Sequence, residues 1–235
     1  MAAGQDCSRQ WCRVPVVRST PLPAAILISG SGTNLQSLID SAARTGIAIS
    51  TVISDRADAH GLERARRAGL PAQLVDPEQF AAREDFDAEL ARQVTASGAG
   101  LVILAGFMRI LSPAFVHTFN GRTLNIHPSL LPLYRGLHTH RRVLEAGDAA
   151  HGCSIHFVTD ELDGGPLVAQ ARISVHADDD ENSLSARVQE REHKLYPLVV
   201  SWFAAGRLQM SDGIAWLDGE RLHRPVVYAE DQEIK

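Results

Sequence analysis

The sequence has no run of about 18 apolar residues, the shortest that a membrane-crossing helix needs. Arg9, Arg13 and Arg18 lie near the start, but no apolar segment beside them would make a secretory signal. Only three cysteines occur, at positions 7, 12 and 153, and such a small odd number argues against a framework of disulfides. These absences predict a protein of a reducing compartment, the cytoplasm, with no membrane attachment.

An excess of positive charge is also missing. The 23 Lys and Arg residues are outnumbered by 28 Asp and Glu residues, which gives a formal net charge of −5. A nucleic-acid-binding domain usually carries a basic face, so no nucleic-acid partner is expected. Hydrophobic residues make up 45% of the chain, enough for a sizeable core, and the composition is compatible with an enzyme of small molecules.

The length of 235 residues allows one large domain or two small ones. Residues 1–22 show no periodicity and end beside prolines, so we expect an N-terminal extension without fixed structure. A transit peptide is the alternative for these residues. Residues 23–230 contain no internal repeat and no low-complexity tract, and we expect them to form a single domain.

Short apolar runs alternate with amphipathic segments through the first half of the chain. Such alternation predicts a three-layer α/β fold, in which a mostly parallel, twisted sheet, Rossmann-like in its N-terminal half, has helices on both faces. Toward the C-terminus, two strands joined by the turn at 163–166 indicate antiparallel pairing. The predicted strands are 24–28, 47–53, 72–75, 101–104, 123–126, 154–159 and 167–175, with short strands within 207–228, and the predicted helices follow residue 33 and span 61–69, 84–97 and 183–204.

A glycine loop at residues 30–34 joins the first predicted strand to a helix. Glycine lets a backbone approach a ligand closely, and the free N–H groups at a helix start favour an anion such as phosphate. A dinucleotide fingerprint would need glycine or alanine where Leu35 stands, which counts against a nicotinamide-dependent reductase, and the lysine of a Walker loop is missing. The loop predicts a phosphate site for a mononucleotide-like group, with a tight turn that binds nothing as the alternative.

Asn125 and His127 lie at the end of a predicted parallel strand. They are two residues apart, so both side chains lie on one face, and ligands of such sheets bind beyond the carboxyl ends of the strands. A lone histidine here is more often structural than catalytic, but the asparagine adds a second polar group for one oxygen. His138, His140 and His151 could suggest a metal site, but no thiolate or carboxylate spacing supports one, and we expect no metal.

Four segments, taken in order, resemble the motifs of one enzyme family. Residues 125–132 (NIHPSLLP) are similar to the signature of the folate-dependent formyltransferases, and residues 160–166 (DELDGGP) are similar to the second catalytic loop of that family. Residues 106–111 (GFMRIL) resemble its folate-cleft loop, and residues 30–34 resemble its phosphate loop. The resemblance covers about residues 24–225 and implies the formyltransferase fold.

The resemblance implies that the chain transfers the formyl group of its co-substrate 10-formyltetrahydrofolate to the glycinamide amine of 5'-phosphoribosylglycinamide, a step of purine biosynthesis. Asn125 and His127 would stabilise the oxyanion that forms, and Asp163 would favour a charged imidazole and relay the proton of the amine. The family's substrate positions match Gly32, Thr33, Asn34, Gln189 and Glu192, and its folate positions match Arg83, Met108, Arg109, Ile110, Leu111 and Asn125, the apolar walls Leu104, Phe107, Val116 and Val158, and the closing residues Thr159, Asp160, Glu161, Leu162 and Asp163.

Several of these roles have a plainer alternative. Asp163 could cap the backbone of its own turn, and Gln189 and Glu192 could lie on a solvated helix face. The apolar residues assigned to the folate could be ordinary core. Thr33 stands where relatives often have serine, a change that keeps the hydroxyl group.

Other functions stay open beside formyl transfer to the ribonucleotide. A methionyl-tRNA formyltransferase shares the SLLP segment, and residues 134–136 resemble it faintly, but it carries a further C-terminal domain that we do not expect here. A 10-formyltetrahydrofolate hydrolase shares the three catalytic side chains but has an N-terminal regulatory domain, whereas about 23 residues precede the first predicted strand. A non-catalytic nucleotide-binding module would not need Asn125, His127 and Asp163 together. The oligomeric state also stays open, a homodimer included.

Overall fold

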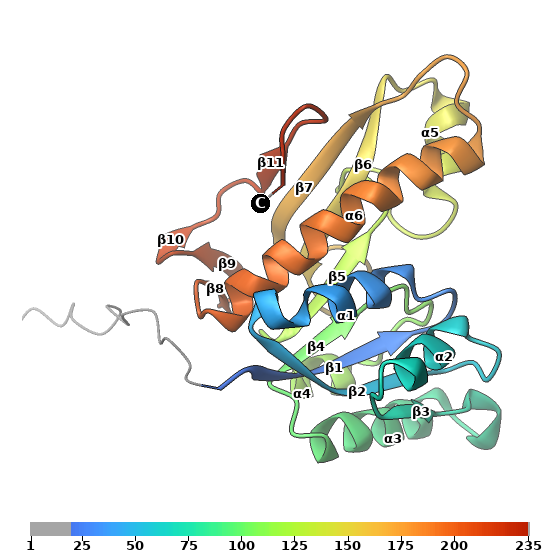
Figure 1. The fold of residues 1–235 in the computed structure, drawn as a ribbon, viewed down its shortest axis with the longest axis vertical. Helices are drawn as coiled ribbons and strands as arrows, with labels where there is room; N and C mark the ends of the chain where they lie inside the picture. The colour runs from blue at the N-terminus through green and yellow to red at the C-terminus, as the bar shows by residue number, and fades with distance from the viewer. Residues whose placement is uncertain (1–19, 235) are drawn as a thin grey trace, which may run out of the picture.

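An eight-stranded sheet runs through the centre of the molecule (Figure 1). The computed structural model describes residues 20–234. The strands follow the order β11-β7-β6-β5-β4-β1-β2-β3; β1 to β5 pair in parallel, and β6 is antiparallel to both of its neighbours. The predicted mixture of parallel and antiparallel pairing is therefore confirmed. The strands of this sheet are β1 (Leu22–Ile28), β2 (Ile47–Ser54), β3 (Ala72–Leu74), β4 (Leu101–Leu104), β5 (Thr123–His127), β6 (Ala150–Phe157), β7 (Leu167–Ser174) and β11 (Val226–Tyr228).

The start of β1 differs from the sequence-based boundary. Leu22, which the sequence assigns to the extension, is the first residue of β1 and is buried. Its backbone N–H donates to the carbonyl of Gly46, 2.8 Å away, so it is already tied to the chain segment that enters β2. The rest of the expected extension, residues 1–19, lies outside the described residues.

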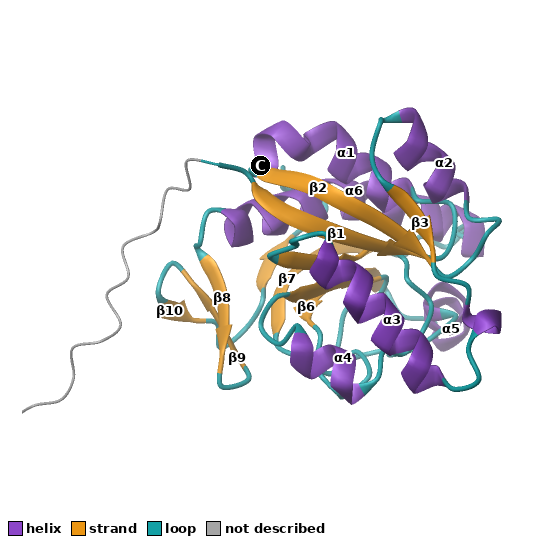
Figure 2. Ribbon diagram, turned by 90° about the horizontal axis from the view of Figure 1, so that it is seen from below, coloured by secondary structure: helices purple, strands orange, loops and turns teal. Residues whose placement is uncertain are grey.

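Helices cover both faces of the sheet, which confirms the three layers (Figure 2). Successive residues of β1 explain how: Ile26 and Ile28 join the core cluster on the side of α1 and α6, whereas Leu27 joins the cluster that holds Phe86 of α3. A strand buried on both faces must be apolar throughout, as this one is. The helices are α1 (Thr33–Thr45), α2 (His60–Arg67), α3 (Arg83–Ala96), α4 (Pro113–Thr118), α5 (Thr139–Ala146) and α6 (Glu181–Ala204), with a 3₁₀ turn at Pro77–Gln79.

The sequence does not predict α4 or α5. These helices have six and eight residues, too few for a periodic apolar signal. Local chemistry still marks the start of α4, because the hydroxyl of Ser112 caps the helix and Pro113 fills its first turn. Strand β6 also begins earlier than predicted, at Ala150 rather than Ser154, since polar residues such as His151 are buried within it.

Beyond α6 the chain forms a second, three-stranded antiparallel sheet and then returns to the first. The order in the small sheet is β10-β9-β8, and β11 then pairs in parallel with β7. The short strands predicted within residues 207–228 are thus confirmed. The strands of the small sheet are β8 (Leu208–Ser211), β9 (Ile214–Leu217) and β10 (Glu220–Arg221).

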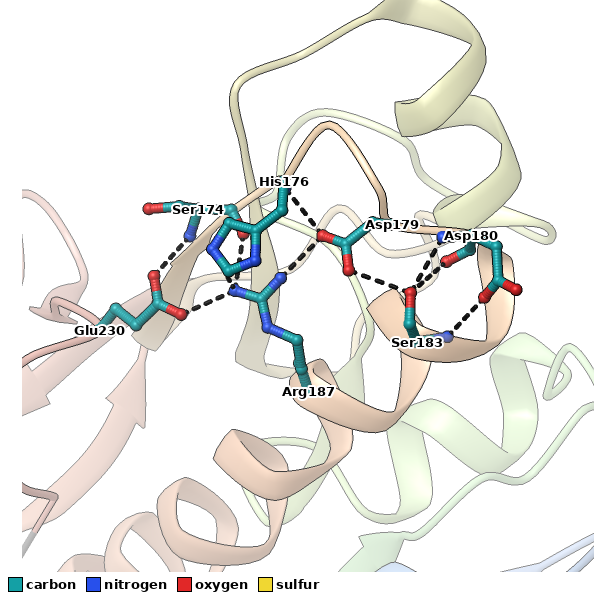
Figure 3. Close-up of polar contacts among 7 residues, drawn as sticks. All are labelled: Ser174, His176, Asp179, Asp180, Ser183, Arg187 and Glu230. Carbon is teal, nitrogen blue, oxygen red and sulfur yellow. Dashed lines mark hydrogen bonds and ion pairs between the residues drawn. The ribbon is translucent and has the colours of Figure 1, made fainter.

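The N-terminus of α6 is fixed by a network of polar contacts (Figure 3). Asp180 and Ser183 form a capping box, in which each side chain bonds the backbone N–H of the other. Arg187, one turn further, donates to the carboxylates of Asp179 and Glu230, both 2.7 Å away. Glu230 follows β11, so this arginine ties the last segment of the chain to the first turns of α6. The acidic residues before this helix therefore serve as its cap and ion-pair partners.

Within residues 20–234, no helix is both long and apolar enough to cross a membrane.

Tyr196 joins the middle of α6 to two neighbouring strands, at the last residue of β4 and the second residue of β5. Its side chain is fully buried, and its hydroxyl lies 3.0 Å from the carbonyl oxygen of Leu104 and 2.9 Å from that of Leu124. Burial raises the pKa of this phenol well above its ordinary value, so the hydroxyl remains a donor. It holds α6 against β4 and β5.

Removing this hydroxyl should destabilise the fold. Y196F leaves two buried carbonyl oxygens without their donor, and we expect the free energy of unfolding to fall by about 1–2 kcal/mol. Urea denaturation measures the change. Y228F is the matched control, because the half-buried hydroxyl of Tyr228 makes no hydrogen bond with the described residues. Equal effects of the two substitutions would contradict the role assigned to Tyr196.

Candidate active site

The carboxyl end of β5 brings polar side chains from two strands together. Asn125 and His127 lie two residues apart on β5, and in the β5–β6 register Asn125 is paired with His156 and His127 with Ser154. The amide nitrogen of Asn125 lies 3.1 Å from Nε2 of His156. Since β5 also pairs with β4, this polar group stands at the centre of the sheet rather than at its rim.

Asp163 faces the buried imidazole of His127. One carboxylate oxygen lies 3.5 Å from Nδ1 of His127, and both side chains are more than nine-tenths buried. Nε2 of the same ring lies 2.9 Å from the carbonyl oxygen of Tyr134. A carbonyl only accepts, so Nε2 carries the hydrogen, and the ring and the carboxylate form an ion pair whenever Nδ1 is protonated as well.

His156 is a member of this group that the sequence does not predict. Its Nδ1 donates to the carbonyl of Phe157, 2.9 Å away, and burial lowers its pKa, so Nε2 is left free to accept the amide hydrogen of Asn125. Nε2 also lies 3.7 Å from the second oxygen of Asp163. The sequence signal is the alternation of Ser154 and His156 in β6, and it points to the site only once the register with β5 is known.

A buried network fixes the segment that follows β5. The hydroxyl of Ser154 donates to the carbonyl of Ser129 and accepts from the backbone N–H of Leu131. The side-chain amide of Gln170 donates to that hydroxyl and to the carbonyl of Leu131, both at 2.8 Å. The SLLP segment is therefore held by strands β6 and β7, and its shape is set before any ligand arrives.

The glycine loop is packed against a second glycine. Gly32 has φ of 70°, and a Cβ built there would lie 2.6 Å from Cα of Gly61. The backbone N–H of Gly61 donates to the carbonyl of Gly30, 3.0 Å away. No side chain caps the start of α1, so its first N–H groups remain available to an anion. Sequence reasoning missed Gly61, which simply stands near the start of a predicted helix.

A cavity of about 250 Å³ opens beside this loop. Inside it, the amide nitrogen of Asn34 donates to the carboxyl of Glu192, 2.8 Å away, while the amide oxygen of Asn34 is buried without a partner among the described residues. Burial raises the pKa of Glu192 to about 7. The cavity is lined by Ser29, Gly30, Ser31, Gly32, Thr33, Asn34, Ala105, Gly106, Met108, Ile126, Pro128, His140, Ser185, Val188, Gln189 and Glu192.

A smaller cavity, of about 90 Å³, lies on the other side of β5. It combines apolar walls with the polar group at the end of the strand, since Asn125, His156 and Asp163 all line it. A flat, partly polar ring needs such an apolar slot with a few fixed hydrogen-bonding groups. The remaining lining residues are Leu104, Phe107, Arg109, Ile110, Leu111, Val116, Val158, Thr159, Asp160, Glu161 and Leu162.

A family model described as formyl transferase matches residues 23–200. The chain belongs to the formyl transferase family. The phosphoribosylglycinamide formyltransferase of Escherichia coli is 55% identical over 209 residues, which cover 88% of this chain and 98% of that protein. Its counterpart in Haemophilus influenzae is 44% identical, over 84% of this chain and 94% of that protein. The solved structure of the Coxiella burnetii phosphoribosylglycinamide formyltransferase matches with a TM-score of 0.85 and 48% identity, over 88% of this chain and 99% of that one. The family resemblance and the formyltransferase fold are thereby confirmed.

Three of the residues expected at the site of this formyl transferase do not line the small cavity. Arg83 does not line the small cavity; its guanidinium lies 3.8 Å from the buried carboxylate of Asp87 at the start of α3. Met108 lines the larger cavity, because its backbone N–H is bonded to the hydroxyl of Ser29. His127 lines neither cavity and stands behind Asp163. Family positions carried over singly do not show which side of the sheet each side chain reaches.

A histidine pair and a further cavity are two other features that could bind a ligand. His140 and His151 are 3.0 Å apart through ring nitrogens, and burial lowers both pKa values, that of His151 to about 4. Among the described residues, no group of three or more potential ligands could hold a metal ion. A third cavity, of about 590 Å³, lies between α1 and α6, but none of the grouped polar side chains at the end of β5 lines it.

The raised pKa of Glu192 makes the stability of this formyl transferase depend on pH. Below pH 4.5 the carboxyl is neutral whether the chain is folded or not; between 4.5 and about 7 it ionises only in the unfolded chain, which lowers the free energy of unfolding. E192Q should therefore match the parent near pH 4 and exceed it by roughly 3 kcal/mol at pH 8. Denaturation at both pH values tests this. E190Q, at an exposed position of the same helix, is the control, and a pH-independent difference for E192Q would contradict the argument.

Proposed function

We propose that this chain transfers the formyl group of 10-formyltetrahydrofolate to the glycinamide amine of 5'-phosphoribosylglycinamide, in purine biosynthesis. The observation that carries the proposal is the buried carboxylate–imidazole pair, Asp163 and His127, beside Asn125, which lines the small cavity together with Asp163. The identity of 55% to the Escherichia coli enzyme supports it. A folate-derived formyl donor follows from the family, and the 10-formyl form is part of our proposal.

In the proposed reaction, the lone pair of the amine forms a C–N bond with the formyl carbon. The carbonyl electron pair moves to oxygen and gives a tetrahedral intermediate with an oxyanion. Collapse restores the C=O bond and breaks the bond to N10 of the folate, which takes up the proton that the amine has lost. The protein must therefore stabilise one transient negative charge and move one proton.

Asn125 is the proposed hydrogen-bond donor to the oxyanion, and His127 is proposed to stabilise its charge as an imidazolium placed behind Asp163. The Asn125 amide is oriented by Nε2 of His156, which accepts one of its two hydrogens and leaves the other free. His127, fixed by the carbonyl of Tyr134, turns Nδ1 toward Asp163 at the wall of the small cavity. In comparable acyl transfers, a donor held in place before the charge develops lowers the activation free energy by about 3–4 kcal/mol. Asp163 is the proposed proton relay, acting through water as base and then as acid.

Each substrate has its proposed side of the sheet. The ribonucleotide phosphate would sit on the free N–H groups of Gly32, Thr33 and Asn34, and its ribose hydroxyls would meet Gln189, Glu192 and the unpartnered amide oxygen of Asn34. The pteridine would occupy the small cavity beside residues 109–111 and 159–163. We further propose that residues 23–230 act as one domain and that the protein works in the cytoplasm. The proposed reaction needs one copy of the chain and is compatible with a homodimer.

The test is a turnover assay with the natural chain and D163N. Wild-type protein should deformylate 10-formyltetrahydrofolate only when the ribonucleotide is present, and D163N should lose about 10²- to 10⁴-fold in kcat because the proton relay is gone. D218N is the matched control, since Asp218 also has a left-handed backbone (φ of 54°, against 48° for Asp163) but lies in an exposed turn. Deformylation without the ribonucleotide would favour a hydrolase, and no turnover would favour a binding module.

The phosphate loop can be tested at Gly32. G32A places a Cβ 2.6 Å from the backbone of Gly61 and must displace the loop, so we expect KM for the ribonucleotide to rise at least about tenfold, the worth of one lost phosphate contact. KM for the folate should change little. G69A serves as control, because Gly69 has the same φ of 70° but open space around it. A parallel rise in both Michaelis constants would argue for general disruption rather than for a phosphate site.

A further inference from the structure

Three consecutive residues of the loop after β5 reach both members of the buried pair. The carbonyl of Tyr134 lies 2.9 Å from Nε2 of His127, and the backbone N–H of Gly136 donates to Asp163 at 2.9 Å. Between them, the side chain of Arg135 is paired with Glu161, in the loop that carries Asp163. We call residues 134–136 the bridging segment, because the ring and the carboxylate are positioned through the same short piece of backbone.

The bridging segment does not hold this shape through its own preferences. Tyr134 has φ of 56° and Gly136 has φ of 78°, both in the left-handed region, which disfavours a tyrosine by about 1 kcal/mol or more. The flanking residues Leu133 and Leu137 are 57% and 66% exposed, so the only apolar packing of the segment is that of the Tyr134 ring, which lies partly buried against the main core cluster of the described residues. Polar contacts from elsewhere in the fold must select this conformation.

The hydroxyl of Tyr134 donates to Asp148 at 2.6 Å, and Arg142 supplies the contacts to the backbone of the segment. One guanidinium nitrogen donates to the carbonyl of Arg135 at 2.6 Å and to that of Leu137 at 3.3 Å. The guanidinium carbon lies 5.2 Å from the centre of the Tyr134 ring, within range of a cation–π interaction. Arg142 stands on α5, next to the fully buried Val143, and thus on a rigid support.

We propose that Arg142 is a positioning residue for the transfer reaction, acting on His127 and Asp163 through the bridging segment. The inference rests on the proposed function, since it assigns those two side chains to the chemistry. Arg142 lines neither of the two cavities beside β5, so it touches neither proposed substrate. Its loss should therefore disturb the reacting geometry and leave binding intact.

The kinetic test uses R142M, which keeps much of the length but removes charge and donors. We expect kcat to fall about 10- to 100-fold, the usual cost of a displacement of about 1 Å in a catalytic group, with both KM values within about twofold. R142K, which can still donate to one carbonyl, should recover part of the loss. R141M is the control: Arg141 is the neighbour on α5, pairs with Glu181 and does not touch the bridging segment, so it should match wild type.

A spectroscopic test separates positioning from stability. In ¹H–¹⁵N spectra of the imidazole groups, wild type and R141M should show His127 with a protected hydrogen on Nε2, and R142M should show that hydrogen exchanging faster with water. If R142M does not fold, R142Q, which cannot reach two carbonyls and the ring together, is measured instead, with the same expected signs. Unchanged kcat and an unchanged Nε2 signal would overturn the proposal, as would equal effects of R141M. Wild-type protein without transfer activity would overturn the function, and the spectra would still decide the role of Arg142.

Discussion

A buried carboxylate facing two buried imidazoles is the interaction on which the site depends. Asp163 lies 3.5 Å from His127 and 3.7 Å from His156, with only 9% of its side chain exposed. A charge so far from water is tolerated only when it is paired and hydrogen-bonded. The end of β5 and the loop after it must therefore dock against the loop that carries Asp163, because His127 and the backbone N–H of Gly136 are partners that the carboxylate needs.

The glycines after Asp163 show how tightly this docking constrains the chain. A Cβ at Gly165 would lie 1.9 Å from the carbonyl oxygen of Phe157, and one at Gly164 would collide with the side chain of Glu161. Asp163 itself has φ of 48°, which aspartate tolerates better than most residues. The DGGP sequence thus allows the loop to turn back against β6 and to direct the Asp163 carboxylate inward rather than toward solvent.

Sequence reasoning was strongest where the signal is local and periodic. The shared face of Asn125 and His127 follows from the two-residue repeat of a strand, and the proposed phosphate loop follows from its glycines. His156 was missed because its importance comes from pairing with Asn125 across an antiparallel register, and Arg142 because it acts on backbone carbonyls that no sequence pattern reveals. The fold class was predictable because the apolar patterns of long helices and strands average over many residues. The helices α4 and α5 were not predictable because six or eight residues are too few to show such a pattern.

The position of the site follows from the two-sided burial of the sheet. Along β5 the side chains alternate, so Asn125 lines the small cavity while Ile126 lines the larger one. The small cavity is lined by Phe107, Leu111 and Val116 of one core cluster. The cavity beside the glycine loop is lined by Val188 of the other core cluster. Two ligands on opposite faces of a continuous sheet cannot touch, since the strands separate them. They can meet only where a central strand ends, and in this chain that strand is β5, which ends at His127. A reaction that joins two bound substrates is therefore confined to the place where the buried pair stands.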